Sequence, residues 1–119
     1  MNLLVCGTRL KSLDYRRTVH DALDSVAKQH GYPSLKIVEG CCPDSADAFA
    51  ESWALYNRVP ILHFPSDPGN YLKRNIEMVN ACDEVLAFWD RFSYGTAHTI
   101  ANALLLKKKV TILTVGGKT

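Results

Sequence analysis

Short apolar runs of strand length alternate along the chain with longer amphipathic segments that have helical spacing. The apolar runs are Leu3–Cys6, Leu35–Val38, Val59–Phe64, Glu84–Phe88 and Val110–Leu113. The helix-length segments between them are Tyr15–His30, Ser45–Tyr56, Asn70–Ala81 and Thr96–Lys107. In the first of these segments, Val19, Leu23 and Val26 fall on one face of a helix. Apolar runs that alternate with helices in this way are typical of parallel strands buried on both faces.

The alternation predicts an α/β fold, a Rossmann-like three-layer sandwich with helices on both faces of a five-stranded, mainly parallel sheet. Because the crossover between two parallel strands is right-handed, we expect the strands to lie in the order 3-2-1-4-5. The chain has 119 residues, a length that usually forms one domain, so we predict a single domain over residues 1–119.

Composition and charge exclude several classes of protein. No stretch has the roughly 18 apolar residues that cross a bilayer, and the first residues lack the pattern of a signal peptide. We therefore expect a cytoplasmic protein with no membrane partner. The net charge of +2 is too small for a general nucleic-acid surface. The basic run Lys107–Lys109 follows a predicted helix, where lysines favour the C-terminus, so it does not change this expectation.

The cysteines and histidines give no pattern of a metal or disulfide site. The four cysteines are Cys6, Cys41, Cys42 and Cys82. Without an export signal we expect free thiols, and the adjacent pair Cys41 and Cys42 lacks the C-x-x-C spacing of a zinc or redox site. No histidine has another four residues away. We therefore expect no metal and no cofactor.

Two junctions between a predicted strand and a helix carry residues that suit an anion. The first apolar run ends in Gly7-Thr8-Arg9, and the fourth is followed by Asp90 and then by Ser93–Thr96. A loop glycine lets backbone N–H groups approach an anion, and a helix N-terminus adds about half a positive charge. In a sheet of order 3-2-1-4-5, strands 1 and 4 meet where the strand order reverses, and ligands bind beyond their carboxyl ends. The pattern predicts a phosphate-bearing ligand at this edge of the sheet.

Side chains expected at the same edge have the chemistry to complete such a site. Arg9 and Arg74 could each hold a phosphate through the planar guanidinium group, or could pair with a neighbouring carboxylate. Asn75 could bond a ribose or a base edge, and Asp47 either bonds a ligand hydroxyl or complements the dipole of its helix. Tyr94, which we expect in the loop, could stack over the ligand. The predicted ligand-binding residues are Gly7, Thr8, Arg9, Gly40, Asp47, Arg74, Asn75, Asp90, Ser93, Tyr94, Gly95 and Thr96.

Four segments in this order resemble a known superfamily. They are Val5–Arg9, Glu39-Gly40 with Ser45-Ala46-Asp47, Arg74–Met78, and Gly95–Ile100. Together they are similar to the SLOG superfamily of Rossmann-like nucleotide-ligand domains, most of all to its small stand-alone members. The superfamily also contains the lonely-guy phosphoribohydrolases, the DNA-processing protein DprA, and sensor domains of nucleotide-signalling defence systems. The resemblance implies a nucleotide or a nucleotide-derived signalling molecule as ligand.

The chain departs from the phosphoribohydrolase signature at the position that serves catalysis. Those enzymes carry P-G-G-x-G-T-x-x-E, and Thr99 stands here where they have the glutamate. Arg74 and Met78 match their R-K-x-x-M helix, so the anion-binding arginine is retained. Cleavage of a glycosidic bond generally needs a carboxylate that stabilises positive charge on the sugar. Ser45 also replaces a glycine of the relatives' G-A-D turn.

The missing glutamate favours ligand binding over catalysis. The resemblance then implies a stand-alone sensor or a protein that sequesters its ligand, as a phage counter-defence protein would do. The alternative is a nucleotide hydrolase of the phosphoribohydrolase or N-glycosidase type, for which Asp90, Glu77 and His98 are the candidate catalytic residues, with Asp47 as another possible carboxylate. A nucleic-acid role like that of DprA is the third possibility, and the small net charge disfavours it.

We also expect the protein to form a homodimer or a larger homo-oligomer. The predicted helices Ser45–Tyr56 and Thr96–Lys107 contain more large apolar residues than one small sheet needs to cover it. Members of the superfamily usually pair through helices.

Overall fold

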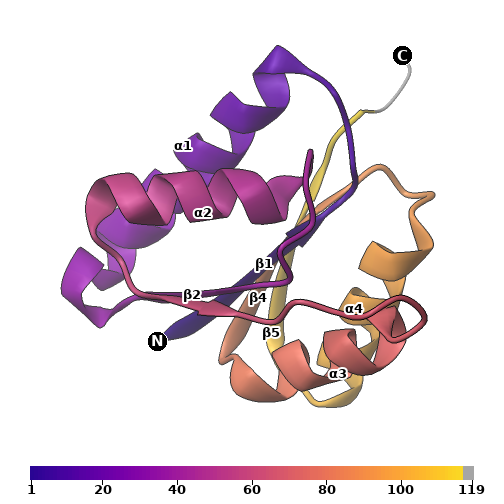
Figure 1. Ribbon diagram of the computed structural model, residues 1–119. Coiled ribbons are helices and arrows are strands. Elements are labelled where there is room, and N and C mark those ends of the chain that lie inside the picture. The colour runs from indigo at the N-terminus through magenta and orange to yellow at the C-terminus, as the bar shows by residue number, and fades with distance from the viewer. Residues whose placement is uncertain (117–119) are drawn as a thin grey trace.

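The computed structural model describes residues 1–116, whose strands form one parallel sheet (Figure 1). The strands are β1 (Asn2–Gly7), β2 (Lys36–Glu39), β3 (Ile61–His63), β4 (Glu84–Trp89) and β5 (Lys109–Thr114). They lie in the order β3-β2-β1-β4-β5, and every pairing is parallel. The predicted fold class and strand order are therefore confirmed.

Two helices cover each face of the sheet. The helices are α1 (Leu13–His30), α2 (Ala46–Asn57), α3 (Tyr71–Ala81) and α4 (Tyr94–Leu105), with a short 3-10 turn, η1 (Tyr32–Ser34), before β2. Helices α1 and α2 pack side by side on one face, and α3 and α4 pack together on the other (Figure 1). No helix within residues 1–116 is long and apolar enough to span a membrane.

The alternation of side chains along β1 divides the core into two layers. Leu3 and Val5 point to the face covered by α1 and α2, whereas Leu4 and Cys6 point to the face covered by α3 and α4. Successive residues of a strand face opposite sides, so a central strand with both faces covered must be apolar throughout. This explains the continuous apolar run in the sequence.

Several predicted boundaries differ from the structure, and two of the differences have a clear local cause. The third strand is shorter than the predicted Val59–Phe64, because the Val59 amide donates to the carbonyl oxygen of Ala54 at 2.8 Å and so belongs to the end of α2. Helix α4 begins at Tyr94 and not at Thr96. The Asp90 carboxylate accepts hydrogen bonds from the amides of Phe92 and Ser93, and this tight turn places Ser93 at the N-cap position, so the helix starts two residues earlier.

Gly7, the last residue of β1, lies where the chain leaves no room for a side chain. A Cβ atom there would be 2.8 Å from Ala46 Cβ on α2 and 2.8 Å from the carbonyl oxygen of Phe88 on β4. Atoms cannot approach this closely, so a larger residue at position 7 would push apart the backbones of β1, β4 and α2. The packing of these elements therefore requires glycine here. At Gly95, in contrast, a Cβ atom would meet nothing within 4 Å.

We therefore expect Gly7→Ala to lower the free energy of unfolding by about 1–3 kcal/mol, the usual cost of overpacking a core. The matched control is Gly95→Ala, which we expect to leave the stability within about 0.5 kcal/mol of the wild type or slightly above it. Urea titration followed by circular dichroism measures both. Equal stabilities for the two variants would contradict this account of Gly7.

Candidate functional site

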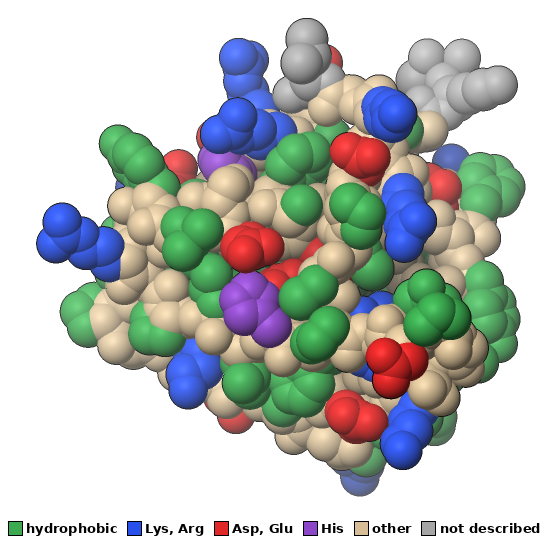
Figure 2. Space-filling view, in the orientation of Figure 1, with side chains coloured by type: hydrophobic (Ala, Val, Ile, Leu, Met, Phe, Trp, Pro, Cys, Tyr) green, Lys and Arg blue, Asp and Glu red, His purple; other side chains and the backbone are tan. Residues whose placement is uncertain are grey.

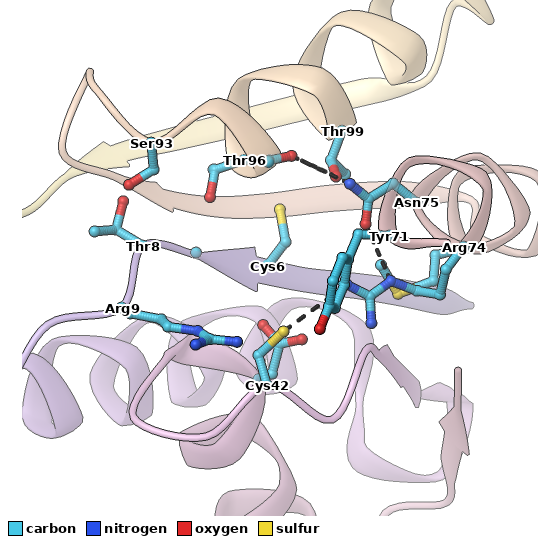
Figure 3. A pocket seen from close by; sticks show the side chains of 14 residues that line it. Cys6, Thr8, Arg9, Cys42, Tyr71, Arg74, Asn75, Ser93, Thr96 and Thr99 are labelled. Carbon is cyan, nitrogen blue, oxygen red and sulfur yellow. Dashed lines mark hydrogen bonds between the residues drawn. The ribbon is translucent and has the colours of Figure 1, made fainter. Parts of the chain in front are cut away.

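A cavity of about 320 Å³ opens at the carboxyl ends of β1 and β4, between α2, α3 and α4 (Figure 3). Its volume lies at the lower end of the range for small-molecule sites. The predicted residues that line it are Gly7, Thr8, Arg9, Asp47, Arg74, Asn75, Ser93, Gly95 and Thr96. The fold therefore brings most of the predicted site residues to one place, at the point where the strand order reverses.

Three predicted site residues do not line the cavity. Gly40 lies behind it, under the Arg74 side chain, and a Cβ atom at Gly40 would be 2.5 Å from Arg74 Nη1. The Asp90 carboxylate is occupied by the turn before α4. Tyr94 is 70% exposed and lies in the first turn of α4 and not in a loop, so it does not cover the cavity as expected for a lid.

Arg74 is buried and holds several parts of the site together. Its Nη1 donates to the carbonyl oxygens of Gly40 at 2.5 Å and Phe64 at 3.1 Å, which follow β2 and β3. Its Nε donates to Asn75 Oδ1 at 3.1 Å, and its guanidinium carbon lies 5.9 Å from the centre of the Tyr71 ring. The Arg74 side chain is thus both a structural clamp and a positive charge at the wall of the cavity.

Asp47 is a buried carboxyl group in the first turn of α2, and like Arg74 it packs against Gly40. Its Oδ2 accepts from the Gly40 amide at 2.9 Å, and its Oδ1 accepts from the Ser45 hydroxyl at 3.3 Å. Burial raises the pKa of Asp47 to about 6, although these hydrogen bonds and the nearby Arg74 favour the charged form. A carboxyl group that titrates near neutrality can accept or donate a proton at a ligand.

The N-terminus of α4 offers backbone donors to the cavity. The amides of Tyr94, Gly95 and Thr96 have no hydrogen-bond acceptor among residues 1–116, as expected for the first turn of a helix. Thr8 lies beside this turn, because its hydroxyl accepts from the amide of Asp90 at 3.0 Å. The arrangement is that of a helix terminus that binds an anion.

Arg9 is exposed and extends from the end of β1 across the mouth of the cavity toward Cys42 (Figure 3). Within residues 1–116 its guanidinium group makes no hydrogen bond and no ion pair. The alternative of a surface arginine paired with a carboxylate is therefore not what the structure shows. The group is available to a ligand.

Sequence reasoning missed several residues that line the cavity. They are Cys6, Cys42, Tyr71, Met78 and Thr99. Tyr71 and Met78 could have been found, since Tyr71, Arg74, Asn75 and Met78 have the spacing i, i+3, i+4, i+7 and share one face of α3. Met78 is buried in the core and also lines the cavity. Cys42 comes from the loop between β2 and α2, which no periodicity describes.

The three candidate catalytic residues lie away from the cavity lining. Glu77 is exposed on α3, and His98 contacts Asn102 one turn later on α4. Hydrogen bonds from the amides of Phe92 and Ser93 outweigh the effect of burial and keep the pKa of Asp90 below its ordinary value. Asp47 is therefore the carboxyl group best placed to act on a ligand in the cavity.

The fold and the cavity define a Rossmann-like domain whose sheet edge suits an anionic ligand. A family model described as the YspA, cpYpsA-related SLOG family matches residues 1–71, more than half of the chain. The protein belongs to this family, which confirms the resemblance to the SLOG superfamily and suggests a role in binding a nucleotide ligand. The match includes β1 and Asp47 and ends before Arg74. No curated protein and no solved structure matches the chain significantly.

The raised pKa of Asp47 predicts a specific pH dependence of stability. The unfolded chain loses this proton near its ordinary pKa of 3.8, whereas the folded chain keeps it up to about 6. Between these values the folded state binds more protons, so the contribution of Asp47 to stability falls as pH rises and is constant above the folded pKa. We expect wild-type stability, relative to Asp47→Asn, to decrease from pH 4 to pH 6.

Urea titrations of both proteins at a series of pH values measure this difference. Asparagine has the size of aspartate and keeps one acceptor oxygen. All other titrating groups are the same in both proteins, so the difference in stability between them reports the titration of Asp47 alone. If the free energy of unfolding of the wild type, minus that of Asp47→Asn, stayed constant or rose from pH 4 to pH 6, the raised pKa of Asp47 would be wrong.

Proposed function

We propose that this protein binds a nucleotide or a nucleotide-derived signalling molecule in the cavity at the carboxyl ends of β1 and β4. It acts as a sensor of this molecule or as a protein that sequesters it, the latter being the activity a phage counter-defence protein needs. The observation that carries the proposal is the convergence of backbone donors at the start of α4 with the Arg9 guanidinium group on one cavity. Family membership supports the same class of ligand.

The cavity has two chemically different ends, which fits a ligand with a phosphate and a sugar or base. Thr8, Ser93 and Thr96 lie at one end, beside the helix N-terminus, and Tyr71 and Asn75 lie at the other (Figure 3). Phosphate oxygens suit the first end because amide donors and the helix dipole favour negative charge. The aromatic ring and the amide side chain suit a base or a ribose at the second end.

Hydrolysis of the ligand is the second candidate function. The observation in its favour is Asp47, a cavity-lining carboxyl group whose pKa is raised to about 6. Such a group can serve as a general acid or base. Against it, Thr99 lines the cavity at the position where the phosphoribohydrolases have their glutamate.

Arg9→Ala tests the proposed binding, because the Arg9 guanidinium group makes no hydrogen bond and no ion pair within residues 1–116. We expect it to weaken the affinity for phosphorylated nucleosides about 10- to 100-fold, the usual worth of a hydrogen bond to a charged group. Titration calorimetry with mononucleotides, dinucleotides and cyclic dinucleotides measures the affinity, and the matched control is Arg17→Ala on the exposed side of α1. Equal affinity of Arg9→Ala and wild type for every phosphorylated compound would overturn the proposal. Arg74→Ala is unsuited as a probe, since it also removes the clamp on Gly40 and Phe64.

Analysis of the bound molecules distinguishes binding from hydrolysis. The protein is incubated with the same compounds and heat-denatured, and the released molecules are identified by mass spectrometry. Intact recovery supports a sensor or sequestering protein. Release of ribose phosphate and free base, lost in Asp47→Asn, would establish the hydrolase.

We further propose that two copies pair through α4. Leu104, Leu105 and Leu106 are 58%, 79% and 48% exposed at the end of this helix. Ile112, on the neighbouring edge strand β5, is 45% exposed. Figure 2 shows further hydrophobic side chains along the right edge of the molecule, beside the beginning of α4 (Figure 1). Several exposed large apolar side chains on one helix and its neighbouring strand are typical of an interaction site.

Leu105→Glu is expected to convert the dimer to a monomer, because it places a charge in the apolar contact. Light scattering coupled to size-exclusion chromatography measures the mass at micromolar concentration. The comparison variant is Leu55→Glu, which alters the exposed apolar surface of α2 and should leave the dimer intact. A monomeric wild type, or dissociation caused only by Leu55→Glu, would contradict pairing through α4.

A further inference from the structure

A second group of reactive side chains lies at the carboxyl ends of β2 and β3. Glu39 is the last residue of β2 and pairs in register with His63, the last residue of β3. Cys41 follows two residues after Glu39, and its Sγ lies 3.5 Å from Glu39 Oε1 and 3.5 Å from His63 Nδ1. One donor atom from each side chain lies within 4.8 Å of the other two. The fold thus brings a carboxylate, a thiol and an imidazole together.

Glu39 is fully buried, and a buried carboxylate needs a cation or a complete set of donors. Its Oε2 accepts from the Cys41 amide at 2.6 Å. Its Oε1 is shared by the Cys41 thiol and by His63 Nδ1, which is its only ion-pair partner within residues 1–116. The His63 side chain is itself 44% exposed. Apart from the Cys41 amide and thiol, the compensation of this buried charge within residues 1–116 therefore comes from one imidazole at the surface.

We propose that Glu39, Cys41 and His63 bind one Zn²⁺ ion. Thiolate, imidazole and carboxylate are the three ligand types that zinc takes in proteins. With typical zinc–ligand bonds, sulfur and nitrogen ligands of a tetrahedral ion are about 3.5 Å apart, which agrees with the separation of Cys41 Sγ and His63 Nδ1. Zinc binding releases the thiol proton of Cys41 to solvent. His63 binds as the neutral tautomer with its proton on Nε2, so Nδ1 gives up the proton that it donates to Glu39, and the ion replaces that hydrogen bond.

The zinc ion leaves one coordination position open toward solvent, because Cys41 and His63 are both exposed. None of the three ligands lines the nucleotide cavity, so the site is separate from it. The ion would join the loop after β2 to the end of β3. That loop carries Cys42 to the wall of the cavity, so zinc would hold this wall in place. The inference does not depend on the proposed nucleotide ligand.

The test uses the full chain without a histidine tag, stripped of metal with a chelator. Zinc affinity is measured by competition with a chromophoric chelator, and Co²⁺ is used as a spectroscopic probe of thiolate ligation. We expect one Zn²⁺ per chain and a thiolate-to-cobalt charge-transfer band. Cys41→Ser and His63→Gln should each weaken zinc binding by more than about tenfold, and Cys41→Ser should abolish the band. Cys41 and His63 are exposed, and glutamine at position 63 still offers an amide donor to Glu39, so circular dichroism should show an unchanged fold.

Two matched control variants test which side chains bind the zinc ion. Cys42→Ser changes the neighbouring thiol, and His30→Gln changes an exposed histidine at the end of α1; both should bind zinc as the wild type does. Zinc should also raise the melting temperature of the wild type and of both controls, and not that of the Cys41→Ser, His63→Gln double variant. Absence of stoichiometric zinc binding by the wild type would overturn the inference. Undiminished binding by Cys41→Ser, or loss of binding in Cys42→Ser equal to that in Cys41→Ser, would do the same.

Discussion

The edge of the sheet that forms the cavity depends on the buried guanidinium group of Arg74. It supplies the donors for the carbonyl oxygens of Gly40 and Phe64, where the chain leaves β2 and β3. Through Asn75, whose amide nitrogen donates to the Gly95 carbonyl oxygen at 3.4 Å, the same group is linked to the start of α4. Without it, buried acceptors from two loops would lose their partners, which costs more than the net gain of a typical hydrogen bond. A rigid set of loops and a positive cavity wall are therefore produced by one side chain.

The charges around the cavity oppose each other in a way that restricts the ligand. Arg9, Arg74 and the N-terminus of α4 favour an anion, while Asp47 adds negative charge when it is ionised. Inorganic phosphate is attracted by Arg9, Arg74 and the helix N-terminus, but it is repelled by the Asp47 carboxylate. A molecule with phosphate at one end and hydroxyl groups at the other can satisfy both, because a hydroxyl donates to a carboxylate. The arrangement therefore favours a phosphorylated sugar or nucleoside over inorganic phosphate.

The predictable part of the structure is the part set by local pattern and by chirality. Alternating apolar runs and helices, with right-handed crossovers, led to the observed strand order. That order brought Gly7–Arg9 to the same place as Ser93–Thr96. The start of α4 was misplaced because the Asp90 turn depends on side-chain hydrogen bonds that periodicity does not register. The group of Glu39, Cys41 and His63 was missed because His63 is 24 residues from Glu39 along the chain and meets it only through the register of β2 with β3.

The loop after β2 connects the two regions of the sheet edge. Gly40 has no space for a side chain, because Arg74 packs against one side of it and Asp47 lies 3.1 Å from where its Cβ would be. The next residue, Cys41, has a φ of 62°, a backbone conformation that L-residues rarely adopt. This turn directs the Cys41 thiol toward Glu39 and His63, while Cys42 reaches the cavity. Because adjacent residues face different sites, any restraint on Cys41 also limits the positions open to Cys42. A change in the position of His63 at the end of β3 is therefore transmitted to the cavity wall through two adjacent residues of this turn, Cys41 and Cys42.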